Sequence, residues 1–443
     1  MLDGVGRSRR IERGLKIIAD LHIHSKYSGA TSQRMNIPEL TSFAQLKGLN
    51  LLGTGDALHP SWLKELKRDL EPIGETGFYK PKMGGEVYFI AQTEVATVHE
   101  YMGKARRIHH VILMPNLEVA EQLSDRLSRF GNVSADGRPV LNMRPSELVE
   151  IVIELDWRNL IFPAHIWTPW WSMLGARGGV DSLEECYEDQ VKHIYAIETG
   201  LSSDPPMNWR VSWLNNLTIL SSSDSHSPYP YRLGREAVIF DLRKPNYMEL
   251  YEAIVWGDQE SKVLMTIEVP PAYGKYHWSG HRNCNFGPIP PEEARKLNYR
   301  CPVCGRTLTK GVDDRVEELA DKPRGYRPKN AKDFIHLIPL QEIVAQSLGL
   351  SGGSETRLNS KKVWNIYDKL ISRFGNEFQV LLEADPKEIA RISNLKIAEL
   401  IMKMRAGRLK MIPGYDGVYG RMVSEEEYER LLKRKYPHLE DYL

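Results

Sequence analysis

Two short stretches of the chain combine histidine with aspartate at spacings that suit a metal-binding site. The first is Asp20-Leu-His22-Ile-His24, which follows an apolar run that begins at Ile17. The second is Asp224-Ser-His226, which also follows a short apolar run. Because side chains two apart on a strand point to the same face, we expect His22 and His24 to face one way. Imidazole and carboxylate groups that converge in this way bind zinc, manganese or iron.

Ionisable residues also end most of the other strand-like runs between Ile17 and Asp241. These residues are Asp56 in "GTGD", Glu94 in "QTEV", His165 in "PAHI" and Glu198 in "AIETG", whereas His109 and His110 open their run. In α/β barrels the active site lies at the C-terminal ends of the parallel strands. The series therefore predicts a multinuclear metal site. Two metals about 4 Å apart activate water and hold phosphate oxygens, so the default chemistry is phosphoester hydrolysis.

Within this series we assign different roles to the carboxylates. Glu94 is the candidate that bridges two metals, because it stands in mid-series with an apolar strand behind it. Glu198 either caps a helix or orients a metal ligand through a hydrogen bond. We expect Asp20 to orient a histidine and not to bind the metal itself.

The elements that must position these residues follow a repeated pattern of strand and amphipathic helix. This pattern predicts an α/β barrel-like domain with a parallel sheet over residues 1–265. The chain has 443 residues, which suggests two or three domains. We expect a small module at 266–312 and a helical C-terminal domain at 313–443. No run approaches the about 18 apolar residues of a membrane span, so we expect no membrane association.

Three of the four cysteines lie close together near the middle of the chain. His281-x-x-Cys284 and Cys301-x-x-Cys304 form two knuckles whose spacing predicts a tetrahedral zinc site. His277 is the alternative fourth ligand. Because the protein fills all four positions, we expect this zinc to be structural. Clustered cysteines of this kind are typical of a reducing compartment, and we expect a cytoplasmic protein.

The strand-end series resembles the polymerase-and-histidinol-phosphatase (PHP) superfamily of metal-dependent phosphoesterases. The motifs that carry the resemblance are "DLHIHS", "GTGD", "TEV", "HHVIL", "PAH" and "SDSHSP". The resemblance implies a distorted seven-stranded β/α barrel, and its metal ligands fall on His22, His24, Glu94, His110, His165, Asp224 and His226. Many relatives have a histidine after the aspartate of "TGDA". Here Ala57 takes that place, so Asp56 or His59 would have to complete a third metal site.

Aromatic and basic residues near these motifs indicate contact with nucleic acid. Trp167, Trp170 and Trp171 follow His165, and Tyr229, Tyr231, Arg232 and Arg235 follow His226. Aromatic groups beside a phosphoester site suit an extruded base, and arginines suit phosphates. Arg324, Tyr326 and Arg327 lie in a basic linker that suits a phosphate backbone. The alternatives are packing for each tryptophan and an ordinary solvated linker.

The C-terminal part adds a further resemblance. The stretch "ISNLKIAELI" is similar to a helix-hairpin-helix DNA motif, although Asn394 stands where that motif has its Gly-rich hairpin, so a plain helical packing unit is an equal alternative. A PHP domain followed by a zinc knuckle, a helical tail and "IPGYDGVYG" is similar to the endonuclease Q family over nearly the whole chain. That resemblance implies cleavage of DNA on the 5′ side of deaminated bases (uracil, hypoxanthine and xanthine) and of abasic sites.

These expectations define one leading function and two alternatives. The leading hypothesis is a DNA repair endonuclease in which Asp224, Glu94 and His226 are catalytic. It requires Mg²⁺ or Mn²⁺ for catalysis, with Zn²⁺ in the structural site and in the active site. Its partner is single- or double-stranded damaged DNA, and a replication clamp is a further candidate partner for the C-terminal helices. The alternatives are a small-molecule phosphatase of the histidinol-phosphatase kind and a DNA-binding scaffold with a vestigial barrel.

Overall fold

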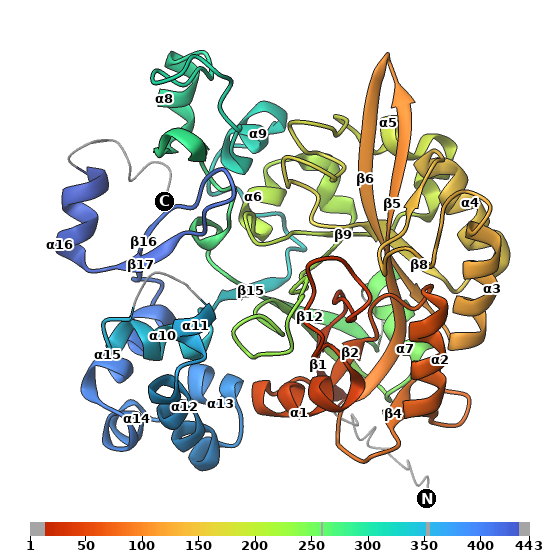
Figure 1. Ribbon diagram of the computed structural model, residues 1–443, viewed down its shortest axis with the longest axis horizontal. Helices are drawn as coiled ribbons and strands as arrows, with labels where there is room; N and C mark the ends of the chain where they lie inside the picture. The colour runs from red at the N-terminus through yellow and green to blue at the C-terminus, as the bar shows by residue number, and fades with distance from the viewer. Residues whose placement is uncertain (1–13, 258–259, 351–354, 434–443) are drawn as a thin grey trace, which may run out of the picture.

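The largest part of the molecule is a distorted barrel of seven strands surrounded by helices (Figure 1). We describe it from a computed structural model, for residues 14–257, 260–350 and 355–433. Its strands are β1 (Leu15–Asp20), β2 (Leu51–Gly53), β5 (Tyr88–Tyr101), β6 (Lys104–Met114), β8 (Leu160–Pro163), β9 (Ala196–Glu198) and β10 (Thr218–Leu220).

The ring of strands closes through isolated contacts, and not through continuous strand pairing, where β8 meets β9 and where β10 meets β1. Strands β1, β2, β5, β6 and β8 pair in that order, and β9 pairs in parallel with β10. The amide of Ile166 donates to the carbonyl of Glu198, which joins the end of β8 to β9. Ile23 forms a parallel bridge with Ser225, which joins the segments after β1 and β10. The site-bearing segments are therefore held together at one end of the barrel.

Among the seven strands of the ring, one departs from the predicted parallel sheet, and β11 (Ala237–Leu242) outside the ring is also antiparallel to β1. Strand β6 runs antiparallel to both β5 and β8, and β5 and β6 form a long hairpin that projects from the barrel (Figure 1). At its tip Met102 and Gly103 both have positive φ, which is the backbone that a two-residue hairpin turn requires. The prediction that His109 and His110 open their strand is therefore wrong, because β6 begins at Lys104.

Helices surround the barrel and begin where the sequence places capping residues. Asn36, Asn116 and Asn246 each accept a hydrogen bond from the backbone amide three residues on, and so cap α1, α3 and α7. The helices and 3-10 turns of this part are α1 (Ile37–Lys47), α2 (Pro60–Asp69), α3 (Leu117–Leu127), α4 (Pro145–Leu155), α5 (Leu183–Tyr187), η1 (Glu188–His193), α6 (Pro205–Trp209), η2 (Ser212–Asn216) and α7 (Tyr247–Val255).

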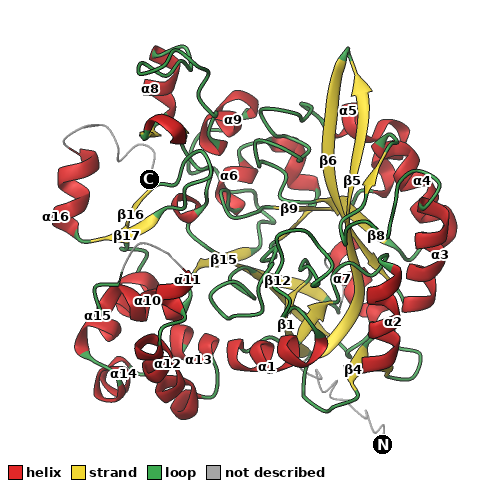
Figure 2. Cartoon of the chain, viewed as in Figure 1, coloured by secondary structure: helices red, strands yellow, loops and turns green. Residues whose placement is uncertain are grey.

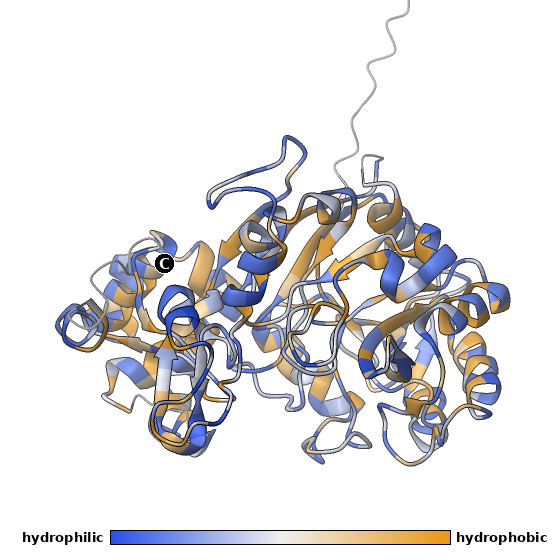
Figure 3. Cartoon of the chain, turned by 90° about the horizontal axis from the view of Figure 1, so that it is seen from above, coloured by the Kyte–Doolittle hydropathy of each residue, from blue (hydrophilic) through white to orange (hydrophobic). Residues whose placement is uncertain are grey.

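The hydrophobic core of the barrel draws on all seven strands and is covered by α7. One residue from each strand is Ile17, Leu51, Ile90, Val111, Phe162, Ala196 and Leu220. Figure 3 shows hydrophobic residues concentrated on the strands, whereas the helices carry both hydrophobic and hydrophilic residues. Further strands extend the sheet or pair at its edges: β3 (Leu70–Pro72), β4 (Tyr79–Pro81), β7 (Val140–Leu141), β11 (Ala237–Leu242), β12 (Lys262–Glu268) and β15 (Asp333–His336).

The chain after β12 forms a small cysteine-containing region and then a group of helices (Figure 2). The first contains η3 (Pro271–Tyr273), β13 (Ser279–His281), η4 (Arg282–Cys284), β14 (Phe286–Ile289), α8 (Pro291–Lys296) and α9 (Val312–Leu319). After it, β15 returns to the barrel and pairs in parallel with β12. The domain limits at 265 and 312 remain a proposal.

The helical part contains α10 (Leu340–Ser347), α11 (Glu355–Leu358), α12 (Lys361–Phe374), α13 (Glu377–Leu382), α14 (Pro386–Ile392) and α15 (Leu395–Arg405). It ends in β16 (Lys410–Ile412), β17 (Arg421–Val423), α16 (Glu425–Tyr428) and a π-helical turn, η5 (Glu429–Lys433). Asn394 caps α15 in the α14–α15 hairpin. None of the helices within the described ranges has the length and apolar character to pass through a bilayer.

A buried ion pair connects the helical part to the barrel. The ammonium of Lys47, at the end of α1, lies 2.7 Å from the carboxylate of Glu377 in α13. The same ammonium donates to the carbonyl of Pro230 at 2.8 Å. Because Pro230 follows the strand end that carries His226, this contact ties the helical part to the segment that lines the site.

Candidate metal centre and substrate cavity

Two groups of candidate metal ligands lie side by side at the barrel end. The first is His22, His24 and Asp224, and the second is Glu94, His109 and His165; within each group the ligand atoms lie within 4.8 Å of one another. His22, His24 and Glu94 are fully buried, and Asp224 is one-third exposed. The structure therefore brings together six groups from distant parts of the chain. Five of them are predicted ligands.

Glu94 connects the two groups through its two carboxylate oxygens. Its Oε1 lies 2.8 Å from Nδ1 of His109 and 3.2 Å from Nε2 of His165. Its Oε2 lies 3.3 Å from Nε2 of His24, which belongs to the other group. This is the geometry expected of the bridging carboxylate that the sequence predicts at Glu94.

Buried carboxylates orient the two histidines of the first group. Nδ1 of His22 lies 3.0 Å from both oxygens of Glu198, and Nδ1 of His24 lies 3.0 Å from Asp56. Such contacts fix the ring and leave Nε2 for a metal. Glu198 thus takes the orienting role considered for it. Asp56 was predicted as a ligand, but it lies behind His24 and also accepts from Ser25, so it too is an orienting residue.

The predicted role of Asp20 is wrong, because it contacts no histidine by hydrogen bond. Its carboxylate accepts from the amide and hydroxyl of Ser223 and from the amide of Gly234. Asp20 therefore holds the segment that carries Asp224 against the end of β1. Burial raises the pKa of Asp20 to about 6, and these hydrogen bonds oppose that rise.

His109 and not His110 belongs to the second group. Neighbouring residues on a strand point to opposite faces, and only His109 faces Glu94. Nδ1 of His110 lies 3.0 Å from the Tyr187 hydroxyl, and its Nε2 lies 3.0 Å from the Thr97 hydroxyl. Both ring nitrogens of His110 are thus engaged on the far face. The motif "HHVIL" offers two candidates: the family resemblance points to His110, and the structure places His109 in the group.

His226 and His59 lie outside both groups. His226 is at the mouth of the site, where its Nδ1 lies 3.0 Å from the carbonyl of Asp224 and its ring lies 4.4 Å from that of His24. Its role as a ligand therefore remains a proposal. His59 stacks on Tyr27 at 4.5 Å, with its Nε2 3.1 Å from the carbonyl of Ser134. His59 therefore contacts the connection between α3 and β7 and not the candidate metal ligands.

The charges and one unpaired nitrogen fit divalent metal ions. Nε2 of His22 is buried and has no hydrogen-bond partner, which is costly unless a ligand meets it. Burial opposes protonation of His22, but Glu198 and Glu94 outweigh it and raise its pKa. Burial also opposes ionisation of Asp224, but the neighbouring histidines lower its pKa well below the usual range. The carboxylates around His22 therefore favour positive charge at this position, which suits a cation.

Three of the site residues have backbone conformations that side chains seldom adopt. The φ angles of Asp56, His165 and Asp224 are 45°, 30° and 48°. Positive φ at non-glycine residues costs free energy and persists only where the surrounding structure imposes it. A Cβ at Gly200 would lie 2.7 Å from the Cβ of His165, so glycine is required beside that ligand. The barrel end therefore imposes the ligand geometry.

A cavity of about 710 Å³ opens beside the candidate metal ligands His165 and Asp224. Its lining combines aromatic and cationic side chains from three parts of the chain: Trp167, Tyr229, Tyr231, Arg232, Arg235, Lys275, Tyr276 and Tyr419. Arg232 lies over the rings of Tyr231 and Tyr419, with its Cζ 5.2 and 5.0 Å from the ring centroids. We call this space the first cavity.

Tyr419 is a cavity residue that sequence reasoning missed. Its hydroxyl accepts from Arg235 at 3.2 Å, and Arg235 also donates to the carbonyl of Ser223. Burial raises the pKa of Tyr419, but Arg235, Arg232 and Lys275 outweigh burial and lower it to about 8. The motif "IPGYDGVYG" contains Tyr419, but nothing in its sequence indicates that this tyrosine reaches the barrel.

The predicted DNA-contacting residues fall into two sets. Trp167, Tyr229, Tyr231, Arg232 and Arg235 line the first cavity, although Trp167 is almost fully buried and donates to Asn208. Trp170 and Trp171 do not line it: Trp170 packs on Tyr276, and Trp171 packs on His109.

The structure does not bring the basic linker to the metal site. Arg324 pairs with Asp313 and Glu317, and Arg327 pairs with Asp333. Tyr326 lies beside Lys322, whose Nζ is 6.0 Å from its ring centroid. Intramolecular ion pairs thus reduce the charge that the linker offers to a phosphate backbone.

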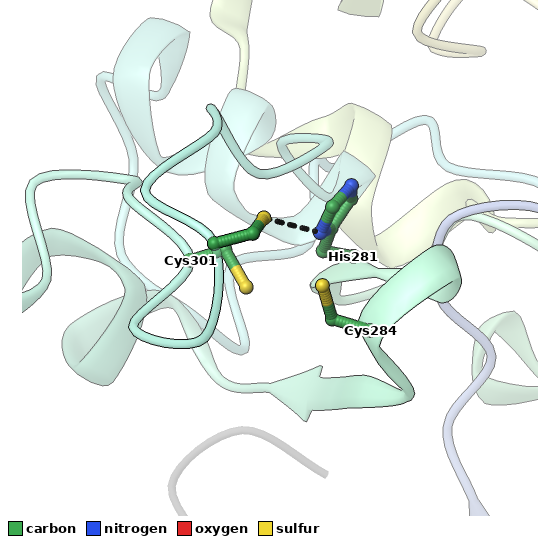
Figure 4. Close-up of side chains that lie close together, drawn as sticks. His281, Cys284 and Cys301 are labelled. Carbon is green, nitrogen blue, oxygen red and sulfur yellow. Dashed lines mark hydrogen bonds between the residues drawn. The ribbon is translucent and has the colours of Figure 1, made fainter.

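The cysteine-containing region brings its four predicted ligands together. His281, Cys284, Cys301 and Cys304 form a third candidate metal site, and Figure 4 shows three of them pointing toward one another. Sγ of Cys304 lies 3.4 Å from Nδ1 of His281. Burial raises the pKa of Cys301, but backbone hydrogen bonds from Cys304 and Val303 lower it to about 6. Within the same cluster, a hydrogen bond with Cys304 raises the pKa of Cys284 to about 11, and zinc, which binds the thiolate, would lower it.

The alternative fourth ligand, His277, lies outside this cluster. It is buried, and its Nδ1 is 3.3 Å from the carbonyl of Ser202. The four-residue set of the sequence prediction is therefore the one that the structure assembles, with no place left for substrate. These donors fit a structural zinc ion.

The chain is similar in sequence to one family model and to two uncharacterized proteins. The family model for the MJ0043 C-terminal domain matches residues 339–408. The chain is 31% identical to the uncharacterized protein YqxK of Bacillus subtilis over 425 residues, which cover 92% of this chain and 99% of that protein. It is 34% identical to the uncharacterized protein MJ0043 of Methanocaldococcus jannaschii over 259 residues, 58% of this chain, and spans only 31% of that protein.

Two solved structures are similar over almost the whole chain. The lesion-specific endonuclease PfuEndoQ from Pyrococcus furiosus matches with a TM-score of 0.80 and 34% identity, covering 96% of this chain and 99% of that one. A structure of endonuclease Q with a 27-mer duplex that has an abasic lesion at the active site matches with a TM-score of 0.83 and 34% identity, covering 95% and 100%. The predicted PHP-type barrel with a zinc module and a helical C-terminal part is thereby confirmed.

Proposed function

This chain belongs to the endonuclease Q family, and on that premise we propose that it is a metal-dependent endonuclease that cuts DNA at damaged nucleotides. The observation that carries the proposal is the position of Glu94, which spans two groups of metal ligands beside the first cavity. A carboxylate between two such groups is the arrangement used for hydrolysis of phosphate esters.

The proposed reaction is hydrolysis of the phosphodiester on the 5′ side of the damaged nucleotide. Divalent ions held by the two groups would supply Lewis-acid charge to the phosphate and to the attacking water. Glu198 and Asp56 keep the rings of His22 and His24 in register through the 3.0 Å contacts at Nδ1. Asp20 holds the segment that carries Asp224 in place through Ser223.

The first cavity is the proposed site of the damaged nucleotide. Tyr229, which is partly exposed and stacks on the buried Tyr231, offers apolar surface to a flipped base or sugar, and Arg232 offers charge to a phosphate. Deamination or base loss weakens pairing in the duplex and so lowers the cost of extrusion. We therefore propose uracil, hypoxanthine, xanthine and abasic sites as the substrates.

The small-molecule phosphatase is the weaker alternative. The first cavity includes Lys275 and Tyr276 from the cysteine-containing region and Tyr419 from the C-terminal part, in addition to barrel residues. A small phosphate ester needs no such additional parts, whereas a long polymer does. A vestigial scaffold is also disfavoured, because six buried or half-buried ligand groups converge on one site.

The experiment uses duplexes labelled at the 5′ end that carry one uracil, one hypoxanthine, one xanthine or one abasic site. Matched duplexes without a lesion and a phosphate monoester serve as controls. With Mg²⁺ or Mn²⁺ we expect a nick on the 5′ side of each lesion and no release of phosphate from the monoester. Intact DNA in every lesion duplex would refute the proposal, and phosphate release alone would support the phosphatase.

A further inference from the structure

A second cavity, of about 420 Å³, meets the metal centre through a different ligand. It is lined by His109, Trp171, Ala96 and residues of the connection between α3 and β7, among them Asp136 and Arg138. The first cavity meets the metal centre through His165 and Asp224, and the two cavities have no lining residue in common. The two groups of candidate metal ligands therefore lie between the first cavity and the second cavity.

Arg138 is the cation of the second cavity that lies nearest to the metal ligands. Its guanidinium is 3.3 Å from Oε2 of Glu94, the same oxygen that faces His24. The side chain is 29% exposed, so it borders the cavity and is not sealed inside the protein. Arg138 is not the only partner of Glu94, because three histidine nitrogens also lie within 3.3 Å of its oxygens.

The connection that carries Arg138 is held rigidly against the metal centre. Asp136 accepts from the amides of Arg138 at 2.9 Å and of Gly29 at 3.0 Å. Between them, Gly137 donates to the carbonyl of Tyr27, and a Cβ at Gly137 would lie 2.3 Å from the carboxylate of Asp56. Only glycine permits so close an approach. Arg138 is therefore placed in advance of substrate binding.

We propose that the second cavity binds the nucleotide on the 5′ side of the scissile phosphate, and that Arg138 contacts the 3′-oxygen that leaves from it. This inference rests on the proposed function. A scissile phosphate at the metal centre has one nucleotide on each side. The larger first cavity takes the extruded damaged nucleotide, so the upstream nucleotide falls on the side of His109 and Arg138.

In this assignment Arg138 stabilises the leaving oxygen of the hydrolysis. Water attacks phosphorus, an O–P bond forms, the bond from phosphorus to the 3′-oxygen breaks, and its electron pair stays on that oxygen. A proton released by the attacking water finally neutralises it. An arginine remains charged throughout, so Arg138 stabilises the developing negative charge and gives up no proton. Such preorganised donors act most strongly on charge that appears in the transition state.

The alternative is that Arg138 only positions Glu94, and a leaving-group substitution separates the two roles. One duplex has the natural 3′-oxygen at the scissile phosphate, and its partner has a bridging 3′-sulfur, whose anion needs far less stabilisation. Cleavage of both is measured in single turnover with Arg138→Ala and Arg138→Lys. Arg129→Ala, an exposed arginine at the start of the same connection, is the matched control.

We expect Arg138→Ala to slow cleavage of the oxygen duplex by about 100-fold and to leave cleavage of the sulfur duplex nearly unchanged. Arg138→Lys should fall between the alanine variant and the wild type, and Arg129→Ala should match the wild type on both duplexes. Metal content and binding of the lesion duplex should be the same in all four proteins.

Equal slowing of both duplexes by Arg138→Ala, or a loss of bound metal, would overturn the inference and leave Arg138 as a positioning residue for Glu94. Those outcomes leave the proposed function intact, because the wild type still cuts. A wild type that cuts neither duplex would instead refute the proposed function, and this inference with it.

Discussion

Removal of the Lys47 ammonium tests how the helical C-terminal part is coupled to the substrate cavity. Its Nζ lies 2.7 Å from Glu377 and 2.8 Å from the carbonyl of Pro230, and both charged side chains are at most 2% exposed. Lys47→Met leaves the Glu377 carboxylate buried without its cation. Breaking such a buried pair costs about 3–5 kcal/mol.

The lower end of that range applies here, because Glu377 keeps two neutral donors. The Tyr367 hydroxyl and the Leu340 amide each lie 3.0 Å from its oxygens. A cost of about 3 kcal/mol corresponds to an equilibrium constant for local opening that is about 100-fold larger. We therefore expect the amides of α13 to exchange with deuterium about 100-fold faster in Lys47→Met than in the wild type, while the barrel strands keep their protection.

A second variant makes the test specific to the ion pair. Lys47→Met combined with Glu377→Gln removes both charges, so its effect should be smaller than the sum of the two single effects by about 1–3 kcal/mol. Lys362→Met, an exposed lysine on α12, is the control for loss of charge alone. Exchange in Lys47→Met within twofold of the control, or strictly additive effects in the double variant, would refute the reasoning.

Four further outcomes are expected. Asp224→Ala should abolish cleavage and leave binding of the lesion duplex intact, as measured by gel shift; retained cleavage would remove Asp224 from the mechanism. Glu198→Gln should weaken metal binding by about 10–100-fold, measured by chelator competition, because His22 loses its anionic partner; unchanged affinity would contradict that role. Cys304→Ser should lower both the zinc content and the melting temperature of the purified protein, whereas zinc retained at the wild-type level would exclude Cys304 as a ligand. The phenol of Tyr419 should ionise near pH 8 in ultraviolet difference spectra, a transition that Tyr419→Phe removes. Because this pKa is lower in the folded protein than the usual value, the phenolate stabilises the fold at high pH, and that contribution is lost as the pH falls through about 8.

The residue types and their strand-end positions were sufficient to predict most of the candidate metal ligands that the structure brings together. His22, His24, Glu94, His165 and Asp224 could be predicted because short apolar runs mark strands, and because the ends of barrel strands converge. The four residues of the candidate zinc site could be predicted for a simpler reason: paired knuckles are local in sequence, and a tetrahedral ion needs four donors.

Only the tertiary structure showed which of two neighbouring histidines faces the site and which role each buried aspartate has. His109 and His110 are adjacent, and only the register of β6 against β5 shows which one faces Glu94. Asp56 and Asp20 are both buried aspartates at strand ends, yet one contacts a histidine and the other holds the segment after β10. The direction in which each of these side chains points depends on strand pairing between residues that are far apart in the chain. No local sequence pattern encodes that pairing.

The positions of site residues in irregular segments could not be predicted from the sequence. Arg138 reaches Glu94 because Gly137 allows its connection to pack against Asp56, and Tyr419 reaches Arg235 from the far end of the chain. Arg138 and Tyr419 both lie outside helices and strands. The periodicity of a helix or strand is the signal from which the burial and direction of a side chain are predicted. The sequence by itself therefore determined the chemistry of the site and the elements that carry it. The long-range packing of loops decided which charged groups surround the substrate.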